Sequence, residues 1–241
     1  MKLVSPVAVR AGADSTAQRM RVLGIETSSI SGSVALVEAG AIIAEGRHGR
    51  ANAHGESIQP LIDAAMAEAG WSRSQLDRIA VGVGPGSFTG LRVGIALALG
   101  IGEGLQIPVV GVGSMAAMAA AAPSEVGLRC AVLDARREEV FAAAYAADGT
   151  ERLQAVALPK AEAAHWLRTQ LQREPTWIGA GCSLAGVPQH EWEHSDLPSA
   201  RFTARLGARV EAHGSPQPLY VRNDVAVRPR LPPNPLSSAK S

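Results

Sequence analysis

A glycine–proline–glycine turn is the first stretch whose residue types could do chemistry. Gly84, Pro85 and Gly86 follow the apolar run 79–83 and precede Ser87 and Thr89, either of which could cap the helix that follows. A strand, a tight turn and a helix start would aim backbone N–H groups and a positive helix dipole at one point, where phosphate can bind. The stretch lacks the lysine and hydroxyl pair of a P-loop, and its glycine spacing departs from G-x-G-x-x-G by one residue. The turn therefore has two interpretations, a phosphate site or a structural corner that permits close packing.

A carboxylate stands at the end of the first predicted strand, residues 21–26. Sheets of the α/β class place ligands at the carboxyl ends of their strands, so Glu26 could help to hold a metal ion and a nucleotide. It could equally be a carboxylate that bonds to its own turn. Glu26, Gly84 and Gly86 are the nucleotide-site candidates, and Asp134 ends the corresponding strand of the second half.

A histidine pair resembles the zinc-protease pattern. His190, Glu191 and His194 have the H-E-x-x-H spacing, which would need a helix to bring both imidazoles to one metal ion. Pro188 and Pro198 bracket the stretch and leave barely two turns. A chance match in a loop is the favoured interpretation.

The elements that would position these residues repeat along the chain. Predicted strands, turns and helices follow the order β-β-β-α-β-α-β-α from residue 20 to 122, and β-β-β-α-β-α from 123 to 226, where the last helix is expected at 204–212. Such repeated units are typical of the actin-like (ASKHA, ribonuclease H-like) fold, an α/β architecture of two lobes. We expect lobes at 20–122 and 123–226, a disordered extension at 1–19 and a disordered tail at 227–241.

The helix expected from about Ser87 to Gly104 has no clear polar face. Its glycines each cost a solvated helix ~1 kcal/mol relative to alanine, so close packing must offset them. Together with the amphipathic helix 57–69 it predicts a helical pairing surface. The residues expected at this surface are Ser57, Leu61, Ala65, Gly90, Gly94 and Ala98.

The bulk composition indicates a globular protein. Hydrophobic residues make up 46% of the 241 residues, and the net charge of +1 gives no overall field that attracts nucleic acid. Arg92, Glu103 and the length of the glycine-rich helix argue against a membrane span. Cys130 and Cys182 are expected to be buried thiols in a reducing cytoplasm.

Several stretches, taken in order, resemble one bacterial family. RVLGIETSS at residues 21–29 and GPGSFTGLRVG at 84–94 are similar to the opening and the central motif of the TsaB (YeaZ) family. The resemblance continues through PVVGV at 108–112, DAR at 134–136 and PLYVRNDVA at 218–226. Glu26 departs from the aspartate usual at its position.

The resemblance implies a function in making threonylcarbamoyladenosine at position 37 of tRNAs that read ANN codons. It implies a non-catalytic scaffold that needs no cofactor, pairs with a catalytic TsaD subunit and recruits the TsaE ATPase, with tRNA contacted only through the complex. Only His54 stands where TsaD carries a histidine pair for metal. Alone, the pairing surface would form a homodimer, because a large apolar patch is rarely left in water. The alternatives are a stand-alone actin-like ATPase or small-molecule kinase and, third, the zinc protease of His190, Glu191 and His194.

Overall fold

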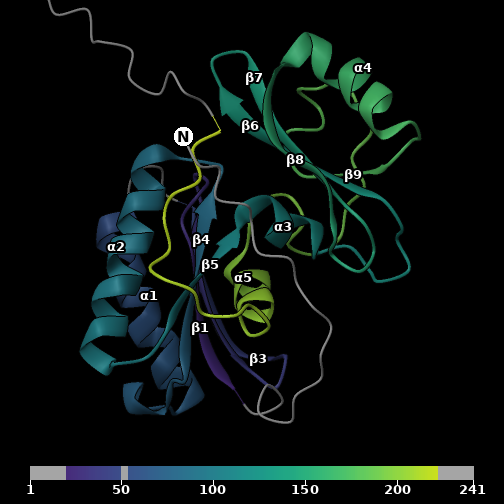
Figure 1. Ribbon diagram of the computed structural model, residues 1–241. Coiled ribbons are helices and arrows are strands. Elements are labelled where there is room, and N and C mark those ends of the chain that lie inside the picture. The colour runs from purple at the N-terminus through teal and green to yellow at the C-terminus, as the bar shows by residue number, and fades with distance from the viewer. Residues whose placement is uncertain (1–19, 50–53, 222–241) are drawn as a thin grey trace, which may run out of the picture.

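The computed structural model describes residues 20–49 and 54–221, which form two β-sheets with helices packed around them (Figure 1). The predicted extension 1–19, the predicted tail 227–241 and the end of the PLYVRNDVA stretch, residues 222–226, lie outside the described residues.

The first sheet has five strands in the order β3-β2-β1-β4-β5. The strands are β1 (Arg21–Glu26), β2 (Gly32–Glu38), β3 (Ala41–His48), β4 (Arg78–Gly84) and β5 (Val109–Gly113). β1, β2 and β3 pair antiparallel because short turns join them, whereas β4 and β5 follow helical crossovers and pair parallel. The carboxyl ends of β1 and β4 therefore lie side by side, which brings Glu26 close to the Gly84 turn.

Helices cover both faces of this sheet. On one face lie α1 (His54–Ala69) and α2 (Phe88–Leu105), with the short 3-10 helix η2 (Arg73–Gln75) between them in sequence (Figure 1). Ile58 and Ile62 of α1 and Ile95 and Ala98 of α2 are buried against strand residues such as Ile25. This apolar layer between helices and sheet is the core of the first lobe.

The second sheet has four strands in the order β8-β7-β6-β9, namely β6 (Arg129–Arg136), β7 (Glu139–Tyr145), β8 (Glu151–Pro159) and β9 (Thr176–Ile178). It repeats the antiparallel start and the parallel crossover of the first sheet, and α4 (Lys160–Leu171) packs against β7 and β8. Two sheets built on the same β-β-β-α-β plan make the fold actin-like, as the sequence predicts.

The last helix corrects the predicted lobe boundary. α5 spans Ala200–Gly207 rather than 204–212, and it packs against β1, β2, β4 and β5 of the first sheet (Figure 1). A side chain at Gly24 or Gly207 would collide with α5 or β4, so small residues set this close approach. Residues 200–221 therefore do not belong to a second lobe of 123–226.

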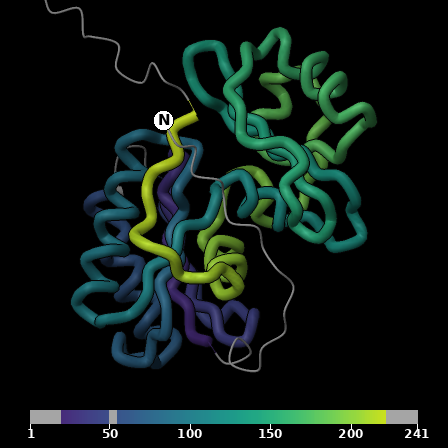
Figure 2. Tube along the Cα trace, viewed as in Figure 1, coloured from purple at the N-terminus to yellow at the C-terminus, as the bar shows by residue number. Residues whose placement is uncertain are grey.

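Two further segments tie the lobes together. α3 (Ser114–Ala119) contacts β4 and β5 as well as β6 and β7, so it lies between the two sheets. The segment after α5 returns along the first lobe, where the Leu219 N–H donates to the Val83 carbonyl at 2.7 Å (Figure 2). Val221, at its end, packs against the cluster formed by α3, β6 and β7.

Candidate functional site

The glycine–proline–glycine turn joins β4 to α2 as predicted. Gly84 has φ of +102°, a left-handed conformation that favours glycine. Ser87 caps α2, since its hydroxyl accepts a hydrogen bond from the Gly90 N–H at 3.2 Å. The corner thus has the strand–turn–helix geometry that an anion site requires.

Two N–H donors of this corner, those of Gly84 and Ser87, are bound within the protein. The Ser87 N–H donates to the Ser28 carbonyl at 2.6 Å, and the Gly84 N–H donates to the Ser114 hydroxyl at 3.1 Å. A side-chain carbon at Gly86 would overlap the Ser28 carbonyl, so the β1–β2 turn lies directly on this glycine. The arrangement favours the packing interpretation of Gly84 and Gly86 over the phosphate-site interpretation.

Glu26 is fully buried between three elements. Its carboxylate accepts hydrogen bonds from the Ser28 N–H at 2.9 Å, the Ser114 hydroxyl at 3.3 Å and the Thr203 hydroxyl at 3.1 Å. Burial raises the pKa of Glu26, and the hydrogen bonds from Ser28, Thr203 and Ser114 act in the opposite direction. A carboxyl held in this way joins β1 to α3 and α5 and does not face an open metal or nucleotide site.

Asp134 also bonds to its own turn, because its carboxylate accepts from the Arg136 N–H at 2.9 Å. Neither strand-end acid therefore supports the stand-alone ATPase. Sequence reasoning missed Ser114 and Thr203, which reach Glu26 from helices 88 and 177 residues away.

The histidine pair lies on irregular backbone rather than on a helix. His194 has φ of +63° and its ring is 3.1 Å from Glu193, whereas the His190 ring stacks on Trp192 with centroids 6.1 Å apart. Within residues 20–49 and 54–221 no group of three metal-ligating side chains comes together. The chance-match interpretation fits this geometry, because the zinc-protease mechanism needs both imidazoles on one helix face.

The two cysteines are free thiols. Cys130 and Cys182 are buried in the core of the second sheet, as predicted. Burial raises the pKa of Cys182 to about 12, which keeps this thiol protonated and unreactive.

The inner side of α2 corrects part of the predicted pairing surface. Gly90, Gly94 and Ala98 are buried against the sheet, as is Ala65 of α1. A side-chain carbon at Gly94 would overlap the Thr27 hydroxyl, which donates to the Gly90 carbonyl at 2.8 Å. These four residues pack inside the chain and are not available to a partner. Ser57 and Leu61 are half-buried and stay predictions.

The outer side of α2 carries the small residues that do reach solvent. Ala96, Gly100 and Gly104 are exposed at four-residue spacing, between the half-buried Leu97 and Ile101, and we call these five residues the outer stripe. A side-chain carbon at Gly100 or Gly104 would meet nothing within 4 Å. Together with Arg73 and Leu105, the stripe lines a shallow hollow of about 440 Å³. Of the described helices, α2 alone is long and apolar enough to cross a membrane, although its inner face packs on the sheet.

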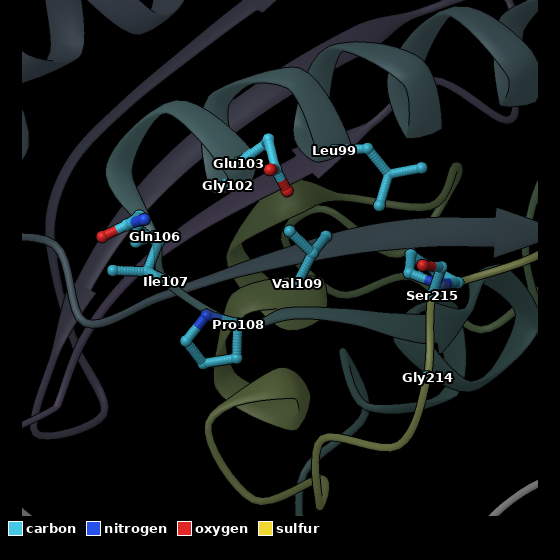
Figure 3. Close-up of a pocket in the computed structure, with 10 residues that line it drawn as sticks. Leu99, Gly102, Glu103, Gln106, Ile107, Pro108, Val109, Gly214 and Ser215 are labelled. Carbon is cyan, nitrogen blue, oxygen red and sulfur yellow. The ribbon is translucent and has the colours of Figure 1, made fainter.

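A second hollow, of about 370 Å³, lies where the end of α2 meets the returning segment (Figure 3). Leu99, Glu103 and Gln106, at the end of α2, line one side of this hollow. Gly214 and Ser215, in the returning segment, line the other side. Glu103 is the one charged side chain among its described lining residues. The hollow thus lacks the paired ionisable groups of a catalytic pocket.

Comparison with known proteins places this architecture in a family. The family model for TsaD, tRNA N6-adenosine threonylcarbamoyltransferase, matches residues 49–177. The chain is 31% identical to the tRNA threonylcarbamoyladenosine biosynthesis protein TsaB of Escherichia coli over 227 residues, covering 86% of this chain and 96% of that protein. It is 38% identical to the protein of the same name from Haemophilus influenzae over 129 residues, about half of each chain (52% and 53%).

Solved structures agree with this assignment. YeaZ from Pseudomonas aeruginosa superposes with a TM-score of 0.68 at 29% identity, covering 83% of this chain and 99% of that one. A second Pseudomonas aeruginosa structure, described as similar to peptidase YeaZ, gives a TM-score of 0.70 over 84% of this chain. The identity to TsaB over most of both chains, the TsaD-type family match and the two-sheet fold agree, and the chain belongs to the TsaB (YeaZ) family of tRNA threonylcarbamoyladenosine biosynthesis proteins.

Proposed function

We propose that this chain is a non-catalytic subunit in threonylcarbamoylation of adenosine 37 in tRNAs that read ANN codons. In this proposal it pairs with a TsaD-like catalytic subunit and recruits a TsaE-like ATPase in the cytoplasm. The names of its relatives support the pathway. The burial of Glu26 and the internal bonds of the Gly84 corner support the division of labour, with nucleotide and metal chemistry left to the partners.

The outer stripe is the observation that carries the pairing proposal. Packing within the chain requires glycine at two positions of α2. A side chain at Gly94 would overlap Thr27, and one at Gly102 would overlap Val109. Gly100 and Gly104 meet no such requirement, yet each costs the helix about 1 kcal/mol relative to alanine. A partner helix that approaches this side closely would account for both glycines, since small residues four apart let two helix backbones pack together.

The surroundings of the stripe fit a helix as its partner. Leu97, Ile101 and Leu105 offer apolar edges beside the small residues, and the hollow of about 440 Å³ lies along them. The exposed side of the neighbouring α1 carries charged residues such as Asp63 and Glu68, which would form a polar rim. In the absence of the partner, the same stripe would pair two copies of this chain, and tRNA would be engaged through the assembled complex.

Co-purification tests the pairing. The full chain is expressed with the catalytic subunit as the wild type, as Gly104→Leu and as Ala161→Leu. Ala161 is a matched control, being an exposed small residue on α4 of the other lobe. We expect Gly104→Leu to lose the partner and Ala161→Leu to retain it. Retention by Gly104→Leu in a folded chain would contradict pairing through the outer stripe.

Reconstitution tests the pathway. The chain, the catalytic subunit and the ATPase are combined with an ANN-reading tRNA, threonine, bicarbonate and ATP, together with the enzyme that forms threonylcarbamoyl-adenylate. Omission of the chain should abolish formation of the modified nucleoside, and the chain alone should form none. Full modification without it would contradict the proposal.

A further inference from the structure

Two exposed aromatic rings lie near the start of α2. The chain has three phenylalanines and two tyrosines. Phe141, Phe202 and Tyr145 are 6–7% exposed and belong to the core, whereas Phe88 is 38% exposed and Tyr220 is 41% exposed. Apolar burial therefore explains three of these five rings, whereas the other two remain largely accessible.

The two rings are held in a fixed arrangement by an arginine. Their centroids are 5.4 Å apart with planes tilted by 33°, although one ring belongs to α2 and the other to the returning segment. The Arg92 guanidinium lies 3.6 Å from the centre of the Phe88 ring, and its Nε donates to the Tyr220 hydroxyl at 3.0 Å. We call Phe88, Arg92 and Tyr220 the aromatic–arginine cluster.

The positive charge of the cluster is not matched within the described chain. Among the described residues, no carboxylate lies within salt-bridge distance of Arg92. The cluster thus presents planar groups and an uncompensated cation together at the surface. Unpaired bases stack on aromatic rings and on guanidinium planes, and their phosphates pair with the cation, so single-stranded nucleic acid matches both properties.

The cluster continues the line of the outer stripe toward the start of α2. Arg92 and Phe88 lie four and eight residues before Ala96, which corresponds to about 6 Å and about 12 Å along the helix axis, and both side chains are exposed. The exposed Ile30 and Leu219 belong to the same end of the first sheet, since the turn of Ser28 contacts Gly86 and Leu219 precedes Tyr220. These two side chains would also suit an apolar protein surface. Such a surface would not pair with the positive charge of Arg92, whereas a phosphate would.

We infer that the aromatic–arginine cluster is a contact for unpaired nucleotides of the RNA substrate within the assembled complex. This inference rests on the proposed function, because it assigns part of the RNA recognition to the non-catalytic subunit. Phe88 and Tyr220 stack on bases, and Arg92 neutralises a phosphate beside them.

Fluorescence anisotropy with the assembled complex tests the inference. The probe is a labelled anticodon stem-loop RNA of an ANN-reading tRNA. The variants of this chain are Phe88→Ala, Phe88→Leu and, as matched control, Leu184→Ala, which alters an equally exposed side chain (39%) outside the cluster. We expect both Phe88 variants to weaken RNA binding about tenfold, because leucine retains apolar area and loses the stacking face, and Leu184→Ala to bind as the wild type.

Separate readouts distinguish the possible failures. Size-exclusion chromatography of each complex shows whether the subunits still pair. Failure of the wild-type chain to assemble would count against the proposed function, whereas loss of assembly in the Phe88 variants alone would place the cluster at a subunit contact and overturn this inference. A photo-crosslinking amino acid at position 88 should label the RNA. Wild-type RNA affinity in Phe88→Leu would overturn the inference, whatever the affinity of Phe88→Ala. A crosslink from position 88 to a protein subunit in place of the RNA would also overturn it.

Discussion

Gly94 and Gly102 turn toward the sheet, whereas Gly100 and Gly104 turn toward solvent, although all four belong to α2. On the inner side, Gly94 of α2 faces Thr27, and two glycines that precede the helix face the neighbouring residues, Gly82 of β4 facing Glu26 and Gly86 of the turn facing Ser28. On the outer side, Gly100 and Gly104 have no atom of the described residues within 4 Å of an added side-chain carbon. The same residue type thus solves a packing problem on one side and leaves a surface for another molecule on the other.

The inner side should be intolerant of any added volume. Gly94→Leu is expected to lower the free energy of unfolding by about 3 kcal/mol, because the side chain must displace Thr27 from its hydrogen bond with Gly90. The melting temperature should fall by about 6–12 °C in differential scanning calorimetry. A Gly94→Leu variant with the melting temperature of the wild type would show that the inner side of α2 has room for a side chain. The two sides of α2 would then not differ in packing.

Glu26, buried beneath the turn that precedes α2, should make the free energy of unfolding depend on pH. Burial raises the pKa of Glu26 above its unfolded value of 4.5, so the folded state keeps a proton that the unfolded state releases as pH rises above that value. Glu26 therefore contributes less to the free energy of unfolding at neutral pH than at pH 4. Glu26→Gln should remove this decrease with rising pH, because glutamine does not titrate. Denaturant unfolding of both proteins at pH 4 to 8 should show the variant gaining relative to the wild type as pH rises. A difference that shrinks with rising pH would indicate an ionised Glu26.

A methyl group added on the outer side of α2 should stabilise the isolated chain. Gly100→Ala places its side chain in open space and should raise the free energy of unfolding of the isolated chain by about 1 kcal/mol. The melting temperature should rise by about 2–4 °C. Gly102→Ala is the matched control on the same helix, where the added carbon overlaps Val109 and stability should not rise. Equal effects of the two substitutions would contradict the assignment of inner and outer sides.

The sequence predicts most elements of the fold because local pattern determines them. The β4–turn–α2 corner is visible in an apolar run, two glycines and a capping serine, and the structure has Ser87 as the cap. The pattern predicts the last helix at 204–212, whereas α5 spans Ala200–Gly207 and packs on the first sheet, where its partners Gly24 and Ala80 lie more than a hundred positions earlier. Local pattern carries no information on such distant packing.

The candidate site was less predictable for the same reason. The spacing of small residues along α2 indicates close packing, but it does not say which of two glycine rows faces the sheet. The pattern therefore predicts Gly90, Gly94 and Ala98 at the pairing surface, whereas the structure buries them and exposes Gly100 and Gly104. Tyr220 lies far from Phe88 in the sequence, so their contact through Arg92 has no local signal.

The most direct test of the account is the affinity of Gly100→Leu for the TsaD-like catalytic subunit, measured by isothermal titration calorimetry beside the wild type and Ala161→Leu. The substitution adds a large side chain in the middle of the outer stripe, where nothing in the chain opposes it. We expect Gly100→Leu to fold and to bind the catalytic subunit with at least tenfold lower affinity, and Ala161→Leu to bind as the wild type. Wild-type affinity in a folded Gly100→Leu would contradict the claim that the outer side of α2 is the pairing surface.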